Sequence, residues 1–179
     1  ANDIIINEIF ADPTPSIGLP EFEYIELYNN TNSTIDLTDW IITIETTEKG
    51  FPTSKIEPDS FVLLVKEDAL NSFPSNISKI GFSSISLTNV GADIVLKDNN
   101  GKTINAISYS DKWYNNEDKS EGGWSIERAN SNLYCERQHN WRASISNIGG
   151  TPGKQNSVSG ENVYIADFRI TNAYIIGSN

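Results

Sequence analysis

The sequence predicts an all-β fold, and three observations carry that prediction. Short runs rich in Ile, Val, Phe and Tyr recur about every 10 to 20 residues, each bounded by Asn, Asp, Gly, Pro or Ser. Within several runs, apolar and polar residues alternate with the period of two that a half-buried strand requires. A third observation is a strong hairpin signal. The chain has 179 residues, which is typical of one main domain.

The first four predicted strands differ in how much of each is expected to be buried. Residues 3–10 and 22–28 come first, and in the second run aliphatic residues alternate with glutamate and tyrosine, which gives one apolar face and one acidic and aromatic face. Residues 40–46 and 61–66 are nearly continuous apolar runs, typical of strands covered on both sides. We therefore expect the last two to be central strands.

Two further local signals follow in the middle of the chain. Residues 92–97 and 102–110 are expected to form a hairpin, because Asp98-Asn99-Asn100-Gly101 lies between them and Asn followed by Gly tolerates the positive φ angles of a tight turn. Residues 67–73 predict a helix of at most two turns, since apolar residues recur there at helical spacing before a proline.

The C-terminal half predicts more loop than strand. Residues 112–123 form a polar loop that carries Trp113 and Tyr114, and residues 124–128 predict a strand. Residues 129–159 have loop composition, with Trp141 expected to anchor them in the core. Within them Thr151-Pro152-Gly153-Lys154 fits a type II turn, because Pro stands second and Gly third.

The domain boundary is expected near residue 157. The main domain would span residues 1–157 and a linker residues 158–162, and residues 163–179 alternate again as a strand does. Because a lone strand has no stability in water, this segment either pairs with the main sheet or opens a following domain. The Gly-, Pro-, Asn- and Ser-rich composition ahead of it favours the following domain.

Several motifs stand in a fixed order along the chain. They are Ile5-Ile6-Asn7-Glu8-Ile9, Glu23-Tyr24-Ile25-Glu26-Leu27-Tyr28-Asn29, Ile35-Asp36-Leu37-Thr38-Asp39-Trp40, Gly91-Ala92-Asp93-Ile94-Val95-Leu96-Lys97-Asp98, Gly123-Trp124-Ser125-Ile126-Glu127-Arg128, Asn140-Trp141 and Gly149-Gly150-Thr151-Pro152-Gly153-Lys154-Gln155-Asn156-Ser157. The series resembles the lamin tail domain in its bacterial form. The departures are Asp39, where the family usually has Gly, and Ala92, where the hairpin often has Gly or Asp.

The resemblance implies an immunoglobulin-like β-sandwich. It also implies an accessory module of secreted or surface proteins, of the kind often found beside nucleases and phosphoesterases. Residues 163–179 fall outside the resemblance and are similar to the opening strand of the immunoglobulin-like domains that often follow such modules.

Composition excludes several classes of function. With 24 Asp and Glu against 13 Lys and Arg, the formal net charge is −11, which repels the phosphate backbone and makes nucleic acid an unexpected partner. The longest apolar runs are far shorter than a membrane span, so no direct membrane insertion is expected. One Cys and one His cannot form an intrachain disulfide or a Cys/His zinc site.

Two sets of residues are candidates for catalysis, and each has a structural alternative. Cys135 and His139 lie four apart and could form a nucleophile and base. The alternative, which we favour, is a loop that docks Trp141. Glu8, Glu23 and Glu26 could supply the paired carboxyl groups of a glycosidase. We favour instead acceptors for backbone N–H groups, or partners for basic side chains.

Calcium and sugar are the candidate ligands. Asp12, Glu21 and Glu23 bracket an acidic loop whose carboxylates and carbonyls could coordinate Ca²⁺, although no EF-hand spacing is present and no other cofactor is expected. Trp113 and Tyr114 could form an exposed platform for a sugar ring or a protein partner. The alternative is that their loop folds back and buries Trp113.

These observations predict a non-catalytic structural or interaction module of a secreted or cell-surface bacterial protein, in the outer membrane or outside the cell. An Asn- and Ser-rich composition favours export. The expected partners are neighbouring domains of the same polypeptide and another protein or a glycan. A carbohydrate-binding module is the alternative, and an accessory domain of a hydrolase ranks third.

Overall fold

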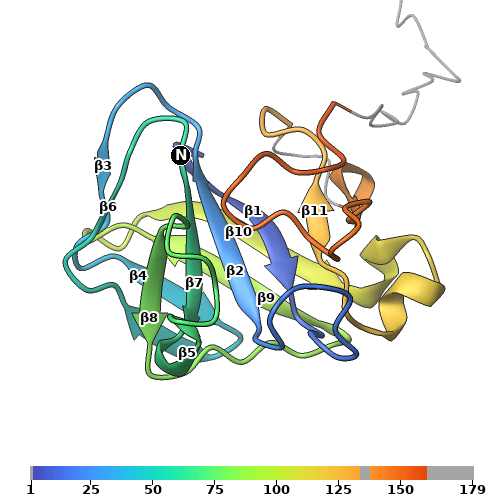
Figure 1. Cartoon of the computed structure of the whole chain (residues 1–179). Coiled ribbons are helices and arrows are strands. Elements are labelled where there is room, and N and C mark those ends of the chain that lie inside the picture. The colour runs from blue at the N-terminus through green and yellow to red at the C-terminus, as the bar shows by residue number, and fades with distance from the viewer. Residues whose placement is uncertain (1, 134–137, 161–179) are drawn as a thin grey trace, which may run out of the picture.

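The architecture is a β-sandwich, seen in a computed structural model that describes residues 2–133 and 138–160. The larger sheet lies in front in Figure 1 and the smaller sheet behind it. In spatial order the larger sheet contains β12 (Trp141–Ala143), β11 (Ile126–Arg128), β1 (Ile4–Phe10), β2 (Tyr24–Asn29), β7 (Phe61–Lys66) and β8 (Lys79–Phe82). The smaller sheet contains β10 (Thr103–Ser110), β9 (Gly91–Lys97), β4 (Ile41–Ile44) and β5 (Thr47–Gly50).

Shorter elements complete the described part of the chain. A two-stranded ribbon pairs β3 (Ile35–Asp36) with β6 (Lys55–Ile56). The single-turn 3-10 helices are η1 (Glu67–Ala69), η2 (Asp111–Tyr114), η3 (Asp118–Glu121) and η4 (Gln138–Asn140). All described strand pairs are antiparallel except β7 with β8, which run parallel. No helix of the described residues is long and apolar enough to cross a membrane.

The main core fills the space between the two sheets. All the long strands contribute residues to it, and in β2 and β9 these alternate regularly: Ile25 and Leu27 from β2 and Ile94 and Leu96 from β9 are all fully buried. Trp40 and Trp141 belong to the same cluster, as expected for residues that anchor a small sandwich.

A second, smaller cluster lies on the outer face of the larger sheet. Its buried members are Phe10, Leu19, Tyr24, Leu63, Val65, Ala69 and Phe73. In β7 the residues Val62 and Leu64 face the main core, while Leu63 and Val65 face this outer cluster. The prediction of a central strand covered on both sides is therefore confirmed for β7, which lies between β2 and β8.

The agreement with the predicted strands is uneven. The hairpin is confirmed, with β9 and β10 in antiparallel register and the Gly101 N–H donating to the Asp98 carbonyl at 2.9 Å. β4 is a central strand, as predicted, because it pairs with β9 on one side and β5 on the other. Only Ile42 and Ile44 of its four residues are buried, however, so the strand is not covered on both sides. The short strands β3, β5, β6, β8 and β12 were not predicted, because each depends on a partner distant in sequence rather than on its own pattern.

The predicted helix over residues 67–73 is wrong in extent, since the structure has the single turn η1 there. A helix of two turns is marginal without tertiary support, and here packing decides the conformation: Ala69 and Phe73 are buried in the outer cluster. The loop prediction for residues 129–159 misses β12, whose three residues pair with β11.

The described contacts continue past the predicted boundary at residue 157. Val158 is completely buried, and the Gly160 N–H donates to the Ala129 carbonyl at 3.1 Å. The predicted strand within residues 163–179 lies outside the described residues, so its two alternatives stay predictions.

Asp39 offers a test of the local backbone. Its φ is +62°, and the Trp40 N–H donates to the Leu37 carbonyl at 3.1 Å, so Asp39 holds the third position of a turn that needs a left-handed residue. We expect Asp39→Gly to leave the free energy of unfolding within about 1 kcal/mol of wild type. Asp39→Val should lower it by about 1–2 kcal/mol, because a β-branched residue is strained at this φ.

Urea unfolding measures both variants of Asp39. The control is Asn32→Val, at an exposed loop position without a positive φ, which should change stability by no more than about 0.5 kcal/mol. Equal stability of Asp39→Val and Asp39→Gly would contradict this account of the turn.

Candidate functional site

Three glutamates form a row across the middle of the larger sheet. Glu8 of β1 lies directly opposite Glu26 of β2 and Glu127 of β11 in the strand register. Adjacent strands are about 4.8 Å apart, so the three side chains emerge side by side on one face. All three residues have 0% exposure. A row of like charges out of water is destabilising unless other groups compensate for it.

A bulge in β1 places Glu8 on this face. The pairing of β1 with β2 shifts by one residue between Ile6 and Glu8. Ile6 and Ile9 both point into the main core, so strict alternation is broken between them. Without the shift, alternation from Ile6 would direct Glu8 into the apolar core. The extra residue, Asn7, donates from Nδ2 to Glu26 Oε1 at 2.9 Å.

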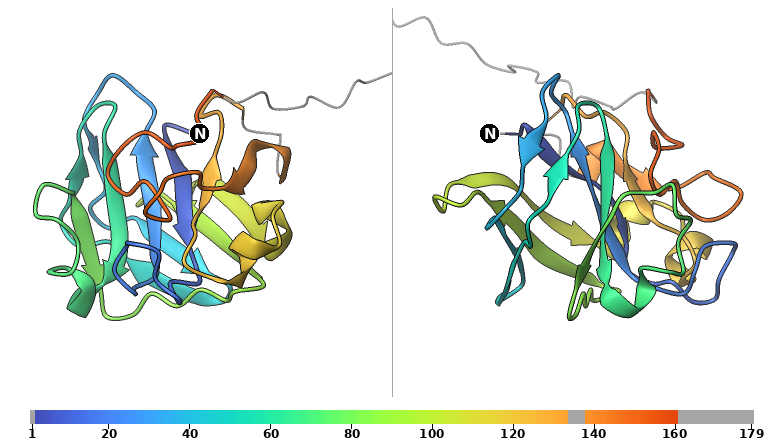
Figure 2. Two further views of the ribbon diagram at one scale, coloured as in Figure 1. Left: turned by 45° about the vertical axis from the view of Figure 1, so that its right-hand side comes forward. Right: turned by 60° about the vertical axis from the view of Figure 1, so that its left-hand side comes forward.

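Residues 149–158, here called the clasp, cover the row of glutamates. Figure 2 shows this segment, in orange, lying over the strands of the larger sheet. Its first bend is the predicted type II turn, with Gly153 at φ +79° and the Lys154 N–H donating to the Thr151 carbonyl at 3.2 Å. Gly150 packs so tightly that a Cβ there would stand 2.7 Å from both Glu8 Oε1 and the Tyr24 hydroxyl.

The Glu8 carboxyl accepts hydrogen bonds from strands and clasp alike. Its Oε1 accepts from the Tyr24 hydroxyl at 2.7 Å, from the Ser125 hydroxyl at 2.6 Å and from the Thr151 N–H at 2.8 Å. Its Oε2 lies 3.2 Å from Thr151 Oγ1. One carboxyl group therefore ties β1, β2, the segment before β11 and the clasp together.

The other two carboxyl groups are held in the same way. Glu26 Oε2 accepts from the Gly153 N–H at 2.6 Å. Glu127 Oε2 accepts from the Ser157 hydroxyl at 2.7 Å and from the Val158 N–H at 3.1 Å, and its Oε1 lies 2.9 Å from Thr151 Oγ1. All six carboxyl oxygens of the row thus have a hydrogen-bond partner.

Burial raises the pKa of Glu8 to about 7, with the Glu127 charge as the second cause and the Ser125, Thr151 and Tyr24 donors opposing both. Burial, followed by the charge of Glu8, also raises the pKa of Glu26 well above its ordinary value. For these two residues the loss of solvation therefore outweighs the hydrogen bonds, and Glu8 and Glu26 retain their protons to a higher pH than exposed glutamates do.

The hydrogen bonds of Thr151 indicate where one proton resides. Its hydroxyl has a single hydrogen but lies within 3.5 Å of three oxygens, on Glu8, Glu127 and Asn156. A proton on Glu8 Oε2 resolves the conflict, because Glu8 then donates to Thr151 and Thr151 donates to Glu127. The three groups then form a directional chain of hydrogen bonds from Glu8 through Thr151 to Glu127.

Asn156 completes the lining of the clasp. Its Nδ2 donates to the Arg128 carbonyl at 2.8 Å and to the Asn7 carbonyl at 3.0 Å, while its Oδ1 accepts from Asn7 Nδ2 at 2.9 Å. The bulge residue and the clasp are thereby joined by reciprocal amide bonds.

The sequence identified part of this site. Glu8 and Glu26 are brought together, and both accept a backbone N–H, as the structural alternative expected. Glu23 lies apart from them and accepts from the Leu87 N–H at 3.1 Å. Glu127, Thr151 and Asn156 were not singled out. The available signal was that Glu8, Glu26 and Glu127 each adjoin an isoleucine in a strand, which places isoleucine inward and glutamate outward.

The calcium candidates do not form a cluster. Burial raises the pKa of Glu23, and the charge of Asp12 contributes to this shift, so these two lie near each other. Glu21 is exposed. Among residues 2–133 and 138–160, no group of three or more His, Cys, Asp or Glu side chains is placed to hold a metal ion.

The proposed exposed platform of Trp113 and Tyr114 is corrected by the structure. Their exposed fractions are 7% and 4%, and Trp113 packs on Trp141 with ring centroids 5.6 Å apart, because η2 turns the loop back onto the core. The loop folds back as the alternative expected. The Tyr114 hydroxyl donates to the Trp124 carbonyl at 2.9 Å.

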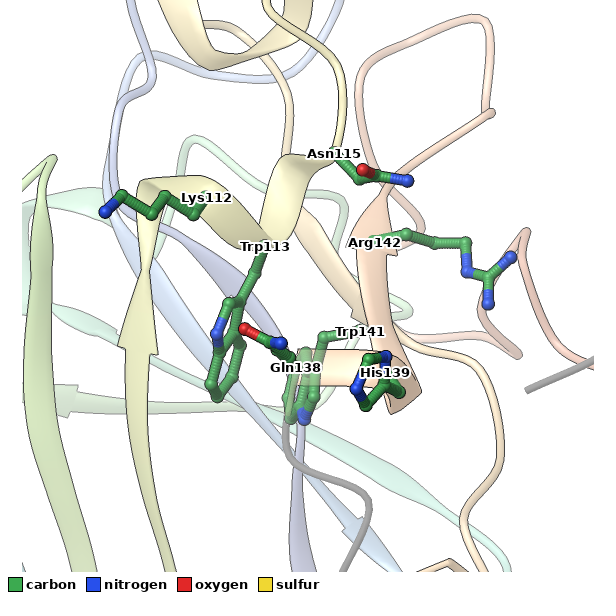
Figure 3. Close-up of a pocket in the computed structure, with 7 residues that line it drawn as sticks. All are labelled: Lys112, Trp113, Asn115, Gln138, His139, Trp141 and Arg142. Carbon is green, nitrogen blue, oxygen red and sulfur yellow. The ribbon is translucent and has the colours of Figure 1, made fainter. Parts of the chain in front are cut away.

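A pocket of about 350 Å³ remains beside Trp113 and Trp141. Figure 3 shows that Lys112 and Arg142 extend away from the two rings in different directions, so their charges do not converge on the pocket. His139 is exposed on the rim. Its candidate partner Cys135 lies outside the described residues, and that pairing stays a prediction.

Comparison with known proteins places most of this chain in one family. Residues 1–111 match the Lamin Tail Domain family. No curated protein matches the chain. The matched region contains Glu8 and Glu26. Glu127 and the clasp come after it in sequence, and the fold brings them next to these two glutamates.

The protonated Glu8 predicts a pH-dependent stability. Its folded pKa, about 7, is above its ordinary value of 4.5, so the folded state binds the proton more tightly than the unfolded state. This contribution to the free energy of unfolding is fully present below about pH 4.5 and is lost as the pH rises toward 7. For one proton the slope is at most about 1.4 kcal/mol per pH unit.

Glu8→Gln is the sharpest test, because its amide can donate to Thr151 in place of the carboxyl proton. We expect this variant to fold and to lose up to one proton's share of the slope in urea unfolding between pH 4.5 and 8, about 1.4 kcal/mol per pH unit at most, while the share of Glu26 remains. Glu21→Gln, at an exposed glutamate, is the matched control and should keep the wild-type slope. An unchanged slope in Glu8→Gln would refute the placement of the proton.

Gly150→Ala tests the fit of the clasp. The added Cβ would meet Glu8, Tyr24 and Leu19 within 2.8 Å, so we expect a loss of about 2 kcal/mol or more in unfolding free energy and faster proteolysis within residues 149–158. Gly50→Ala is the control, since its Cβ would meet nothing within 4 Å. Equal behaviour of the two variants would show that the clasp is not tightly packed.

Proposed function

Because the chain belongs to the lamin tail domain family, an immunoglobulin-like and typically non-enzymatic family, we propose that it is a structural and interaction module of a secreted or cell-surface bacterial protein. In this role it holds neighbouring domains of the same polypeptide and contacts another protein or a surface. The two sheets provide a rigid framework. The loops and the outer face of the larger sheet provide the surface that contacts the partner.

One observation carries the non-catalytic part of the proposal. Glu8 and Glu26, the carboxyl groups that could act as a glycosidase pair, have 0% exposure, and each of their carboxyl oxygens takes part in an internal hydrogen bond. A glycosidase needs its two carboxyl groups to face the scissile bond. Here a substrate would have to displace the clasp, which these same bonds hold in place.

The remaining candidate groups support the same proposal. Glu23 is engaged by the Leu87 N–H, and His139 stands exposed on the rim of a pocket whose basic side chains diverge. A general acid–base catalyst needs a positioned partner within hydrogen-bond reach. Among residues 2–133 and 138–160, no hydrogen bond or ion pair gives His139 such a partner.

Charge supports the proposed choice of partners. The net charge of −11 favours solubility and works against binding to nucleic acid, whose affinity depends on Lys and Arg. Proteins and glycans are therefore the favoured partners.

An activity screen tests the proposal. We expect no turnover of nuclease, phosphoesterase or glycosidase substrates by the wild-type protein, and therefore no difference in Glu26→Gln or in His139→Ala, which changes an exposed residue. Separation of the native host cell into medium, surface and cytoplasmic fractions should place the protein in one of the first two. Turnover that disappears in His139→Ala, or a cytoplasmic location, would overturn the proposal.

A further inference from the structure

An aromatic pair lies on the outer face of the larger sheet, next to the clasp. Tyr28 of β2 and Phe61 of β7 are direct partners in the strand register, and their rings stack with centroids 4.8 Å apart and an angle of 26° between planes. Both side chains are only partly buried. Unlike Trp113 and Tyr114, this pair keeps aromatic surface open to a ligand.

The pair lies in a pocket of about 370 Å³. Its lining residues come from both ends of the chain and are Asn7, Tyr28, Asp59, Phe61, Arg128, Ala129, Ser131, Gln155, Asn156 and Ser159. This volume is at the small end of ligand sites, which run from about 300 to 1,000 Å³, so it suits a ligand of one or two rings.

The polar groups around the rings offer both donors and acceptors. Asp59, which lines the pocket, accepts from the Tyr28 hydroxyl at 3.2 Å through Oδ1, which leaves Oδ2 as an acceptor. Gln155 donates from Nε2 to the Ser159 hydroxyl at 2.8 Å, and its amide oxygen stays available.

This combination fits a sugar. The electron-rich faces of aromatic rings attract the positively polarised C–H groups on the flat side of a pyranose, while neutral amides, hydroxyls and a carboxylate bind its hydroxyl groups. Eight of the ten lining residues are uncharged, and the guanidinium of Arg128 already donates to the Ile6 and Leu133 carbonyls, so the lining favours a neutral ligand. We propose that the Tyr28–Phe61 pocket binds a neutral sugar residue of a glycan.

The clasp forms one wall of this pocket. Gln155 and Asn156 belong to it, and Asn156 is the residue that joins the clasp to Asn7 by reciprocal amide bonds. Sugar binding therefore requires the docked clasp and, through it, the buried glutamates. The proposal deepens the function proposed above, since it names the chemistry of one surface to which the module attaches.

The test uses an array of immobilised β-1,4-linked oligosaccharides of glucose, xylose, mannose and N-acetylglucosamine, followed by calorimetric titration with the oligosaccharide that binds. We expect Tyr28→Ala and Phe61→Ala to weaken binding at least about tenfold, and Gln155→Ala, at an exposed position, several-fold. Tyr28→Phe should retain most of the affinity because the ring remains.

Gln138→Ala is the matched control, an exposed glutamine on the rim of the other pocket, and should bind as wild type does. Thermal melting of each variant separates lost binding from lost folding, and Gln155→Ala keeps the test valid if either aromatic variant unfolds. Absence of binding to every sugar, or affinity unaffected by Gln155→Ala and Tyr28→Ala, would overturn the sugar site. Either result leaves the non-catalytic module intact, which only the activity and localisation tests can refute.

Discussion

The rest of this structure depends on one requirement: three adjacent buried glutamates must find hydrogen-bond donors, and Glu8 must retain a proton. A buried carboxylate without partners costs several kcal/mol, and three in a row would repel one another as well. The fold meets this constraint with donors from four segments that are remote in sequence, and with a proton that Glu8 retains. The row therefore acts as a set of acceptors that selects one arrangement of strands and clasp.

The bulge and the clasp together allow the row of glutamates to be buried. The register shift at Asn7 directs Glu8 outward while it preserves the inward positions of Ile6 and Ile9. Residues 149–158 cover the outward glutamates and supply hydrogen-bond donors that replace their lost solvation. The Thr151 and Gly153 backbone N–H groups donate to glutamates more than 100 residues earlier in the chain. Docking of the clasp therefore joins the late part of the domain to its first two strands.

The sequence predicted what depends on local pattern and missed what depends on distant partners. The β9–β10 hairpin and the turn at Thr151-Pro152-Gly153-Lys154 followed from their own residues. By contrast, β12 and η1 depend on tertiary contacts, and a polar loop with two aromatic residues does not show whether the rings face solvent or core. Glu8 and Glu26 were recognised as acceptors, but their meeting with Glu127 required the strand order β11-β1-β2, which no local pattern specifies.

The clasp connects the buried glutamates with the proposed sugar pocket. Its inner side binds the glutamates through Thr151 and Gly153, and its outer side contributes Gln155 to the pocket that contains Tyr28 and Phe61. Because one short segment does both, the orientation of the pocket wall is set by buried hydrogen bonds rather than by flexible surface contacts. A site positioned by such a shell loses little conformational entropy when a ligand binds. In this module, polar groups that resemble catalytic residues in type serve instead to fix the geometry of a neighbouring surface.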